Sequence, residues 1–248
     1  LFCFSDCLYP QMLTNRGYRL GGLANIAALP PHKDLYAVLV NRFSERLIAS
    51  GVKVFLGTAP SVADLAELKP DTLIVATGSA PVIPRFCEGI ANAVTAEDIL
   101  TGKAKAGQRV LVVGGGMVGS ETAEYLAAQG RSVTVVEMLP QLAKDMEWCA
   151  RVLLLRRMAS LGIKLRSGNE ILSIGAGNAV TVRNEKGREE TLSGFDTLVV
   201  AVGCRPDNAL SDGLSAALDC PCVAVGDCRK TAKIMDAVHS GFEAALTL

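Results

Sequence analysis

Residues 109–138 read RVLVVGGGMVGSETAEYLAAQGRSVTVVEM, and this stretch decides the fold of the chain. Its first apolar run is followed at once by glycines in the spacing G-x-G-x-x-G, namely Gly114, Gly116 and Gly119. Helix-forming residues come next, and a second apolar run ends in the acid Glu137. The order predicts a buried strand, a glycine turn, a helix and a second buried strand, which is the context that the motif requires.

Each glycine of the motif has a different mechanical role. Gly114 makes the tight turn, Gly116 lets the backbone approach a pyrophosphate, and Gly119 lets helix and strand pack closely. The first turn of the helix, with Met117 and Val118, offers free N–H groups and a positive dipole end to the phosphates. The stretch therefore predicts a dinucleotide site.

The acid at the tip of the second strand indicates which dinucleotide binds. A carboxylate at that position accepts hydrogen bonds from the adenosine-ribose hydroxyls and repels a 2′-phosphate. Glu137 therefore favours NAD(H) over NADP(H).

Composition limits the class of protein. The 248 residues are 50% hydrophobic and 5% aromatic, with 25 basic and 25 acidic side chains and a net charge of zero. This balance suits an α/β protein with buried sheets and gives no basic stripe for nucleic acid or an anionic membrane. The sequence shows neither an apolar run of about 20 residues nor a signal-peptide pattern. We therefore expect a cytoplasmic protein with no nucleic-acid or membrane partner.

Eight cysteines are spread over the chain. A core of this size needs no disulfide framework, so free thiols in a reducing compartment are the simpler interpretation. Neither Cys3 with Cys7 nor Cys220 with Cys222 has a complete metal-ligand spacing, so we expect no metal. A remnant cluster site near Cys3 and Cys7 stays a minor alternative.

Periodicity predicts the remaining elements. After an irregular start, helices are expected at 33–50, at 96–100 behind the N-cap Thr95, at 141–161 and at 233–246. Apolar strands are expected at 52–56, 73–76, 163–165, 198–202 and 223–225. Between residues 170 and 190 the period approaches two, which indicates a small antiparallel hairpin or meander.

Three of the strands stop at a small residue and a glycine. The segments are IVATG at 74–78, VVAVG at 199–203 and VAVGD at 223–227. Small residues at the carboxyl ends of parallel strands let a cofactor approach the backbone. Each segment alone indicates only a strand end. The three segments together with the glycine turn indicate a cofactor site more specifically.

These segments together resemble the pyridine nucleotide–disulfide oxidoreductase-like flavoproteins. The resemblance is strongest to the C-terminal FAD/NAD(P)-binding half of the 2-enoate reductase, 2,4-dienoyl-CoA reductase and trimethylamine dehydrogenase group. The matching segments are LGGLANIAALPP at 20–31, DTLIVATG at 71–78, VTAEDILTG at 94–102, the glycine unit, AVGCRPDN at 201–208, VGD at 225–227 and GFEAA at 241–245.

The resemblance implies an α/β fold with Rossmann-like doubly wound sheets. An NAD(H)-binding domain, 107–196, would be inserted in an FAD-type domain formed by 1–106 and 197–248. The resemblance adds candidate nicotinamide-cofactor residues to the glycine motif and Glu137, namely Glu121 and Gly203. The candidate flavin or ADP residues are Gly22, Thr77, Gly78, Gly226 and Asp227.

The chain departs from this family at two points. In the family, the flavin domain begins with its own strand, glycine turn and helix. No such unit precedes Gly22 in this sequence. We therefore expect an incomplete FAD-type domain, as in a fragment or an internally deleted enzyme. The reactive C-x₄-C pair of the disulfide reductases does not follow Gly22 either.

The expected function is that of an NADH-dependent flavin oxidoreductase module. Hydride would pass from NADH to FAD, and electrons would pass onward to an FMN or iron–sulfur domain or chain of an enoate or dienoyl-CoA reductase-like enzyme. The hydride chemistry belongs to the cofactors, so no catalytic acid or base is assigned, and His32 and His239 have no positioned partner in the sequence. Glu121 and Glu124 would either reach the nicotinamide or lie on a solvated helix face. The alternative function is a non-catalytic module that binds NAD(H) or ADP.

Overall fold

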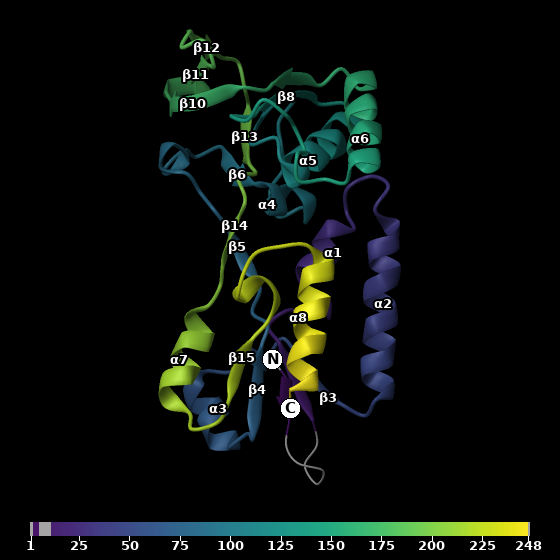
Figure 1. Ribbon diagram of the computed structural model, residues 1–248. Coiled ribbons are helices and arrows are strands. Elements are labelled where there is room, and N and C mark those ends of the chain that lie inside the picture. Colours follow the sequence, from purple (N-terminus) through teal and green to yellow (C-terminus); the bar gives the residue numbers. More distant parts are fainter. Residues whose placement is uncertain (1, 5–10, 248) are drawn as a thin grey trace. The chain divides into compact units, whose positions relative to one another are not determined.

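The structure is a computed structural model that describes residues 2–4 and 11–247 (Figure 1). The chain forms two compact units. Unit 1 contains residues 1–28, 33–80 and 204–248, and unit 2 contains residues 29–32 and 81–203. Two short strands adjoin the boundaries between the units and pair with each other: β5 (Ser79–Pro81) and β14 (Cys204–Pro206).

Unit 2 is built on a parallel sheet of five strands in the order β6-β13-β7-β8-β9. Its strands are β6 (Ala93–Thr95), β7 (Arg109–Val113), β8 (Ser132–Val136), β9 (Lys164–Arg166) and β13 (Thr197–Val200). Its helices are α4 (Ala96–Leu100), α5 (Met117–Ala128) and α6 (Trp148–Ser160), with short 3-10 turns at Arg85–Cys87 and Ala176–Asn178.

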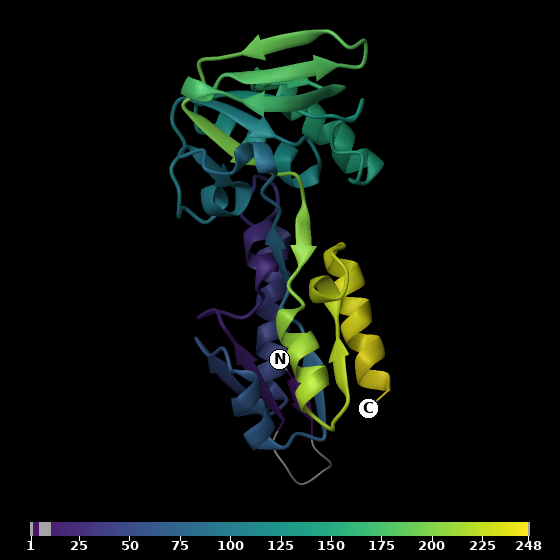
Figure 2. The same cartoon turned by 90° about the vertical axis from the view of Figure 1, so that its left-hand side faces the viewer.

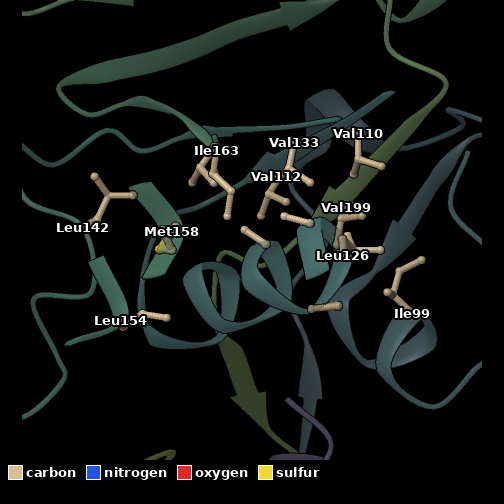
Figure 3. Close-up of a cluster of buried hydrophobic side chains, with 14 of the residues drawn as sticks. Ile99, Val110, Val112, Leu126, Val133, Leu142, Leu154, Met158, Ile163 and Val199 are labelled. Atoms are coloured by element: carbon tan, nitrogen blue, oxygen red, sulfur yellow. The ribbon is translucent and has the colours of Figure 1, made fainter. Parts of the chain in front are cut away.

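Side-chain alternation along β7 divides the core of unit 2 into two layers. Val110 and Val112 face the helices and pack with Leu126 of α5 and Met158 of α6 (Figure 3). Leu111 and the other alternate side chains of the strand face the opposite side. Successive side chains of a strand point to opposite faces, so this uninterrupted apolar strand is buried on both.

The second face of the parallel sheet is covered by strands. β10 (Asn169–Ile174), β11 (Val180–Asn184) and β12 (Glu189–Leu192) form an antiparallel sheet, as the period near two predicted. Val180 and Val182 of β11 pack on Leu111 and Leu198. Unit 2 is therefore a layer of helices, a parallel sheet and an antiparallel sheet, and the predicted α/β class is confirmed.

Unit 1 has a five-stranded sheet in the order β15-β4-β1-β2-β3 (Figure 2). Its strands are β1 (Phe2–Phe4), β2 (Met12–Asn15), β3 (Lys53–Leu56), β4 (Thr72–Val75) and β15 (Cys222–Ala224). Its helices are α1 (Leu23–Ala27), α2 (Asp34–Ala49), α3 (Val62–Leu68), α7 (Ala209–Ala217) and α8 (Ile234–Leu246), with a 3-10 turn at Gly226–Cys228.

The sheet of unit 1 is also apolar on both faces. Leu73 and Val75 of β4 pack with Leu65 of α3 and Leu214 of α7. On the opposite face, Ile74 packs with Val225 and with Ala244 of α8. β2 and β3 are parallel, as are β4 and β15, but β1 is antiparallel to both of its neighbours.

Several elements differ from their predicted limits. The helix expected at 141–161 begins only at Trp148, because Ala143 has the left-handed φ of 47° and its N–H donates to Gly115 O at 2.7 Å. The start of the chain is not irregular, since β1, β2 and α1 lie there.

The sequence-based expectations do not include helices α3 and α7, although the capping box between Ser61 and Asp64 is a readable signal for α3. The N-cap of α4 is confirmed by the 3.0 Å bond from Asp98 N–H to Thr95 Oγ1.

Unit 2 contains the expected inserted domain, 107–196, together with flanking residues. Unit 2 takes in residues 81–106 because β6 pairs with β13 and α4 packs on the core of the parallel sheet. The assignment of each unit to a cofactor remains a prediction.

A buried ion pair joins α5 to α6. Glu124 is only 3% exposed, and Arg157 contacts it through Nε and, at 3.1 Å, through Nη2. The hydrogen bond to Glu124 raises the pKa of the Arg157 guanidinium above its ordinary value. Because the pair satisfies a carboxylate that has almost no access to water, the helix layer depends on both partners.

We expect Arg157→Leu to destabilise the protein by about 3 kcal/mol, since it leaves the buried Glu124 charge uncompensated. Arg183→Leu is the matched control, because its pair with Glu170 is 2.8 Å long but half exposed and should be worth less than about 1 kcal/mol. Urea unfolding of both variants measures the difference. Equal losses would show that the Glu124 pair contributes no more than a surface pair.

Gly119 sets the distance between α5 and β7. A Cβ added to this residue would lie 2.0 Å from the carbonyl oxygen of Gly114, which is backbone and cannot rotate away. We expect Gly119→Ala to lower the free energy of unfolding by about 3 kcal/mol. Gly241→Ala in α8 is the control, since no heavy atom lies within 4 Å of its added Cβ. Helix propensity predicts that this control stabilises by about 0.5–1 kcal/mol, and equal effects on thermal unfolding would contradict the proposed contact.

Candidate dinucleotide site

The glycine turn lies at the switch point of the parallel sheet of unit 2. β7 is flanked by β8, which follows through α5, and on its other side by β13. The strand order reverses at β7, and ligands of open α/β sheets bind at such a point, beyond the carboxyl ends of the strands. The residues between β7 and the start of α5 are therefore in the position that a cofactor turn requires.

The glycines of the motif fall into two kinds in the structure. Gly114 has φ 99°, and its added Cβ would lie 2.5 Å from Ala201 O, so packing excludes a side chain there as it does at Gly119. At Gly116 the added Cβ would meet only the Asp145 carboxylate oxygens, 3.8 and 3.9 Å away. The second glycine thus leaves its surface open, as close approach of a pyrophosphate demands, and the turn fits a dinucleotide.

Glu137 lies directly beside the turn. Its carboxylate is buried and accepts hydrogen bonds from Gly115 N–H at 2.6 Å and from Leu139 N–H at 2.7 Å. Each bond uses one oxygen, and each carboxylate oxygen has a second lone pair. The side chain is thus fixed at the strand tip with acceptor capacity left for ribose hydroxyls.

The N-terminus of α5 has no side-chain cap of its own, because the N-cap residue is Gly116. Met117 N–H donates to Asp145 Oδ1 at 2.9 Å, so a carboxylate from another segment occupies one donor of the first turn. Val118 is half exposed at the surface of the same turn.

The other predicted residues of unit 2 lie on the same carboxyl edge or on α5. Ala201 N–H donates to Val113 O at 2.8 Å, which places the end of β13, and Gly203 shortly after it, next to the turn. Glu121 follows on α5 and is 8% exposed. The structure thus brings together the glycine motif, Glu137 and the end of β13.

Glu124 does not lie on a solvated helix face. Its carboxylate is taken up by Arg157, and His32 Nε2 lies 4.0 Å from Glu124 Oε1. The ion pair with Arg157 between α5 and α6 accounts for a buried acid at position 124, and no contact with a nicotinamide is needed to explain it. His239 lies exposed on α8 in unit 1.

The candidate residues of unit 1 gather at the ends of two neighbouring strands. Thr77 and Gly78 follow β4, and Gly226 and Asp227 follow the adjacent parallel strand β15. Ser79 Oγ donates to Asp227 Oδ2 at 3.2 Å, which ties the two strand ends together. Gly22 is not at these strand ends: it is exposed and is the N-cap of α1.

The centre of the unit 1 sheet does not supply a flavin pyrophosphate turn. β1 lies between β4 and β2 and is antiparallel to both. Its carboxyl end therefore points to the edge opposite to the one where Thr77 and Asp227 lie. Among the residues that the structure describes, unit 1 has the strand ends typical of an FAD domain but no glycine turn at its central strand.

The cysteines do not form a redox pair in the described part of the chain. Free thiols are found at Cys87, Cys149, Cys220, Cys222 and Cys228. Burial raises the pKa of the Cys87 thiol to about 11, so it stays protonated and unreactive near neutral pH. Cys7 lies outside the described residues, and within these residues no three His, Cys, Asp or Glu side chains gather as metal ligands.

The structure adds residues that the sequence did not point to. Leu142, Ala143 and Asp145 contact the glycine turn from the segment between β8 and α6. The residue preferences of this segment predict a helix from residue 141. The βαβ topology could have indicated this contact. The chain that leaves the second strand of a βαβ unit emerges at the same sheet edge as the glycine turn.

The sequence is similar to those of known oxidoreductases over most of its length. The chain is 35% identical over 242 residues to an NADH oxidase of Thermoanaerobacter brockii and 36% identical over 238 residues to a bilirubin reductase of Mediterraneibacter gnavus. These matches cover 94% and 92% of this chain but only 36% and 35% of the relatives. The chain thus spans about a third of the length of the curated relatives it matches.

Solved structures show the same fold. A 2-naphthoyl-CoA reductase superposes with a TM-score of 0.88 at 28% identity, covering 96% of this chain and 36% of that one. Histamine dehydrogenase from Rhizobium sp. 4-9 superposes with a TM-score of 0.85 at 19% identity, covering 96% of this chain and 40% of that one. Both superpositions extend over nearly the whole of this chain.

The family match extends over most of both units. Residues 36–241 match the pyridine nucleotide-disulphide oxidoreductases, a family of FAD- and NAD(P)H-binding proteins, which confirms the resemblance found in the sequence. The chain belongs to the pyridine nucleotide-disulphide oxidoreductase family.

Proposed function

We propose that this chain is the NADH-binding module of a flavin-dependent oxidoreductase. The observation that carries the proposal is the glycine turn of unit 2, where the open Gly116 and the buried Glu137, which is bonded to Gly115, both lie at the switch point of a parallel sheet. A family of NAD(P)H-dependent flavin oxidoreductases and a relative named NADH oxidase support it.

The residues of the turn would bind and orient the cofactor. Backbone N–H groups at the start of α5 would face the pyrophosphate, and the helix dipole would add to this attraction. Glu137 would accept the ribose hydroxyls while Gly203 lines the same edge. NADH, when bound, supplies the hydride, and the chain contributes position and electrostatics rather than an acid or base.

The acceptor in this proposal is a flavin, with onward transfer to a second flavin or an iron–sulfur centre. Relatives named bilirubin reductase and cinnamate reductase support a reductase that acts on an unsaturated organic compound. We propose that an FMN or iron–sulfur domain or chain, absent from residues 1–248, is the partner.

A second candidate function follows from the antiparallel central strand of unit 1. Because β1 brings no glycine turn to the edge with Thr77 and Asp227, this chain by itself would hold NAD(H) or ADP without turnover. Such a module would depend on another segment for its flavin.

Reconstitution separates the two functions. The purified chain is incubated with FAD, passed through a desalting column and titrated with NADH without oxygen. A retained yellow colour that NADH bleaches supports the oxidoreductase. A colourless protein that still binds NADH supports the non-catalytic module.

We also propose that the protein is cytoplasmic. The free thiols at Cys87, Cys149, Cys220, Cys222 and Cys228 are consistent with a reducing cytoplasm. No helix within the described residues has the length and apolar character that a membrane crossing requires.

We expect NADH to bind at least about tenfold more tightly than NADPH, because the Glu137 carboxylate favours two ribose hydroxyls over a 2′-phosphate. Glu137→Ala should narrow this preference severalfold in fluorescence titrations with both dinucleotides. Glu137→Gln is the companion variant, since its amide oxygen retains one acceptor for the turn while the charge is lost. Equal affinities in the unmutated protein would refute the assignment of Glu137.

A further inference from the structure

The carboxylate of Asp145 lies where the proposed function places a pyrophosphate. Asp145 Oδ1 accepts a 2.9 Å hydrogen bond from Met117 N–H, the first N–H of α5. Both carboxylate oxygens lie within 3.9 Å of the position that a Cβ on Gly116 would take. A negative group therefore lies beside the open glycine and occupies one of the donors.

The segment that carries Asp145 is fastened to the turn by its neighbours. Ala143 N–H donates to Gly115 O at 2.7 Å, and Ala143 holds a left-handed φ of 47° that is rare for a residue with a side chain. Leu142 is buried, and its side chain lies against Gly115. These contacts fix where residue 145 emerges, independently of its own side chain.

The Asp145 side chain itself is free to leave. It is exposed, so rotation about its own bonds would release Met117 N–H into solvent. An anion at a helix N-terminus is stabilised by the helix dipole, and two anions at the same terminus repel each other. Asp145 and a dinucleotide pyrophosphate would thus compete for one site.

We propose that Asp145 is an internal competitor of the pyrophosphate and sets the affinity of the glycine turn for NAD(H). The inference rests on the proposed function and adds a residue that tunes it. Asp145 holds the helix N-terminus while no dinucleotide is bound and turns away when one binds. The cofactor then replaces an anion of the chain rather than water.

Asp145→Asn tests the proposal in the full chain. An asparagine oxygen still accepts from Met117 N–H, but the charge is gone. We expect NADH to bind about three- to tenfold more tightly in fluorescence titrations at low salt. The gain should shrink at high salt because the competition is electrostatic. Inorganic pyrophosphate should also bind more tightly to the variant, measured as displacement of NADH that is held well below its Kd in each protein.

Glu147→Gln is the matched control. It removes the same charge only two residues away, from an exposed side chain that makes no cap hydrogen bond, and should change the NADH affinity less than twofold. Asp145→Ser, which keeps a hydroxyl acceptor, is the second variant and should also bind more tightly. Circular dichroism identifies any variant that has lost its fold.

The outcomes separate this inference from the proposed function. Unchanged or weaker binding by folded Asp145→Asn and Asp145→Ser, with NADH binding intact in the unmutated chain, overturns only the competition and leaves Asp145 as a helix cap. Absence of NADH binding by every protein overturns the proposed function and the competition together. Equal gains in Asp145→Asn and Glu147→Gln overturn the competition as well, because a general charge effect would then suffice.

Discussion

The close contact of α5 with β7 is the constraint on which the proposed dinucleotide site depends. Gly119 has no room for a side chain against Gly114 O, and Gly114 has none against Ala201 O. These two approaches fix the N-terminus of α5 at the carboxyl edge of the sheet, beside the end of β13. A helix held a few ångströms further away would point the same N–H groups past the switch point rather than at it.

Around this fixed terminus the chain places its own anions. Glu137 accepts Gly115 N–H, and Asp145 accepts Met117 N–H, so two carboxylates satisfy backbone donors of one turn. Their environments differ, since Glu137 is buried and Asp145 is exposed. The buried carboxylate is suited to hold the turn and define the ribose position. The exposed one is suited to exchange with a ligand. Burial, rather than residue type, distinguishes their roles.

The two units use one α/β plan with different central strands. In unit 2, β7 runs parallel to both neighbours and delivers the glycine turn to the edge where β8 and β13 end. In unit 1, β1 runs antiparallel, so within the described residues no such turn lies beside the small residues after β4 and β15. Strand direction at the sheet centre therefore determines what each unit offers a nucleotide. This difference makes NADH binding the better supported half of the proposed flavoenzyme chemistry.

Local sequence determined the strand–turn–helix unit at residues 109–138, the antiparallel strands after residue 169 and the N-cap at Thr95, because spacing, period and capping act over a few neighbouring residues. The tertiary structure alone decided the path of residues 139–147, where contacts with Gly115 overrode helix propensity. It also decided the pairing of Glu124 with Arg157 and the reversed direction of β1. These features depend on contacts between residues far apart in the chain, and local residue patterns carry no information about such contacts.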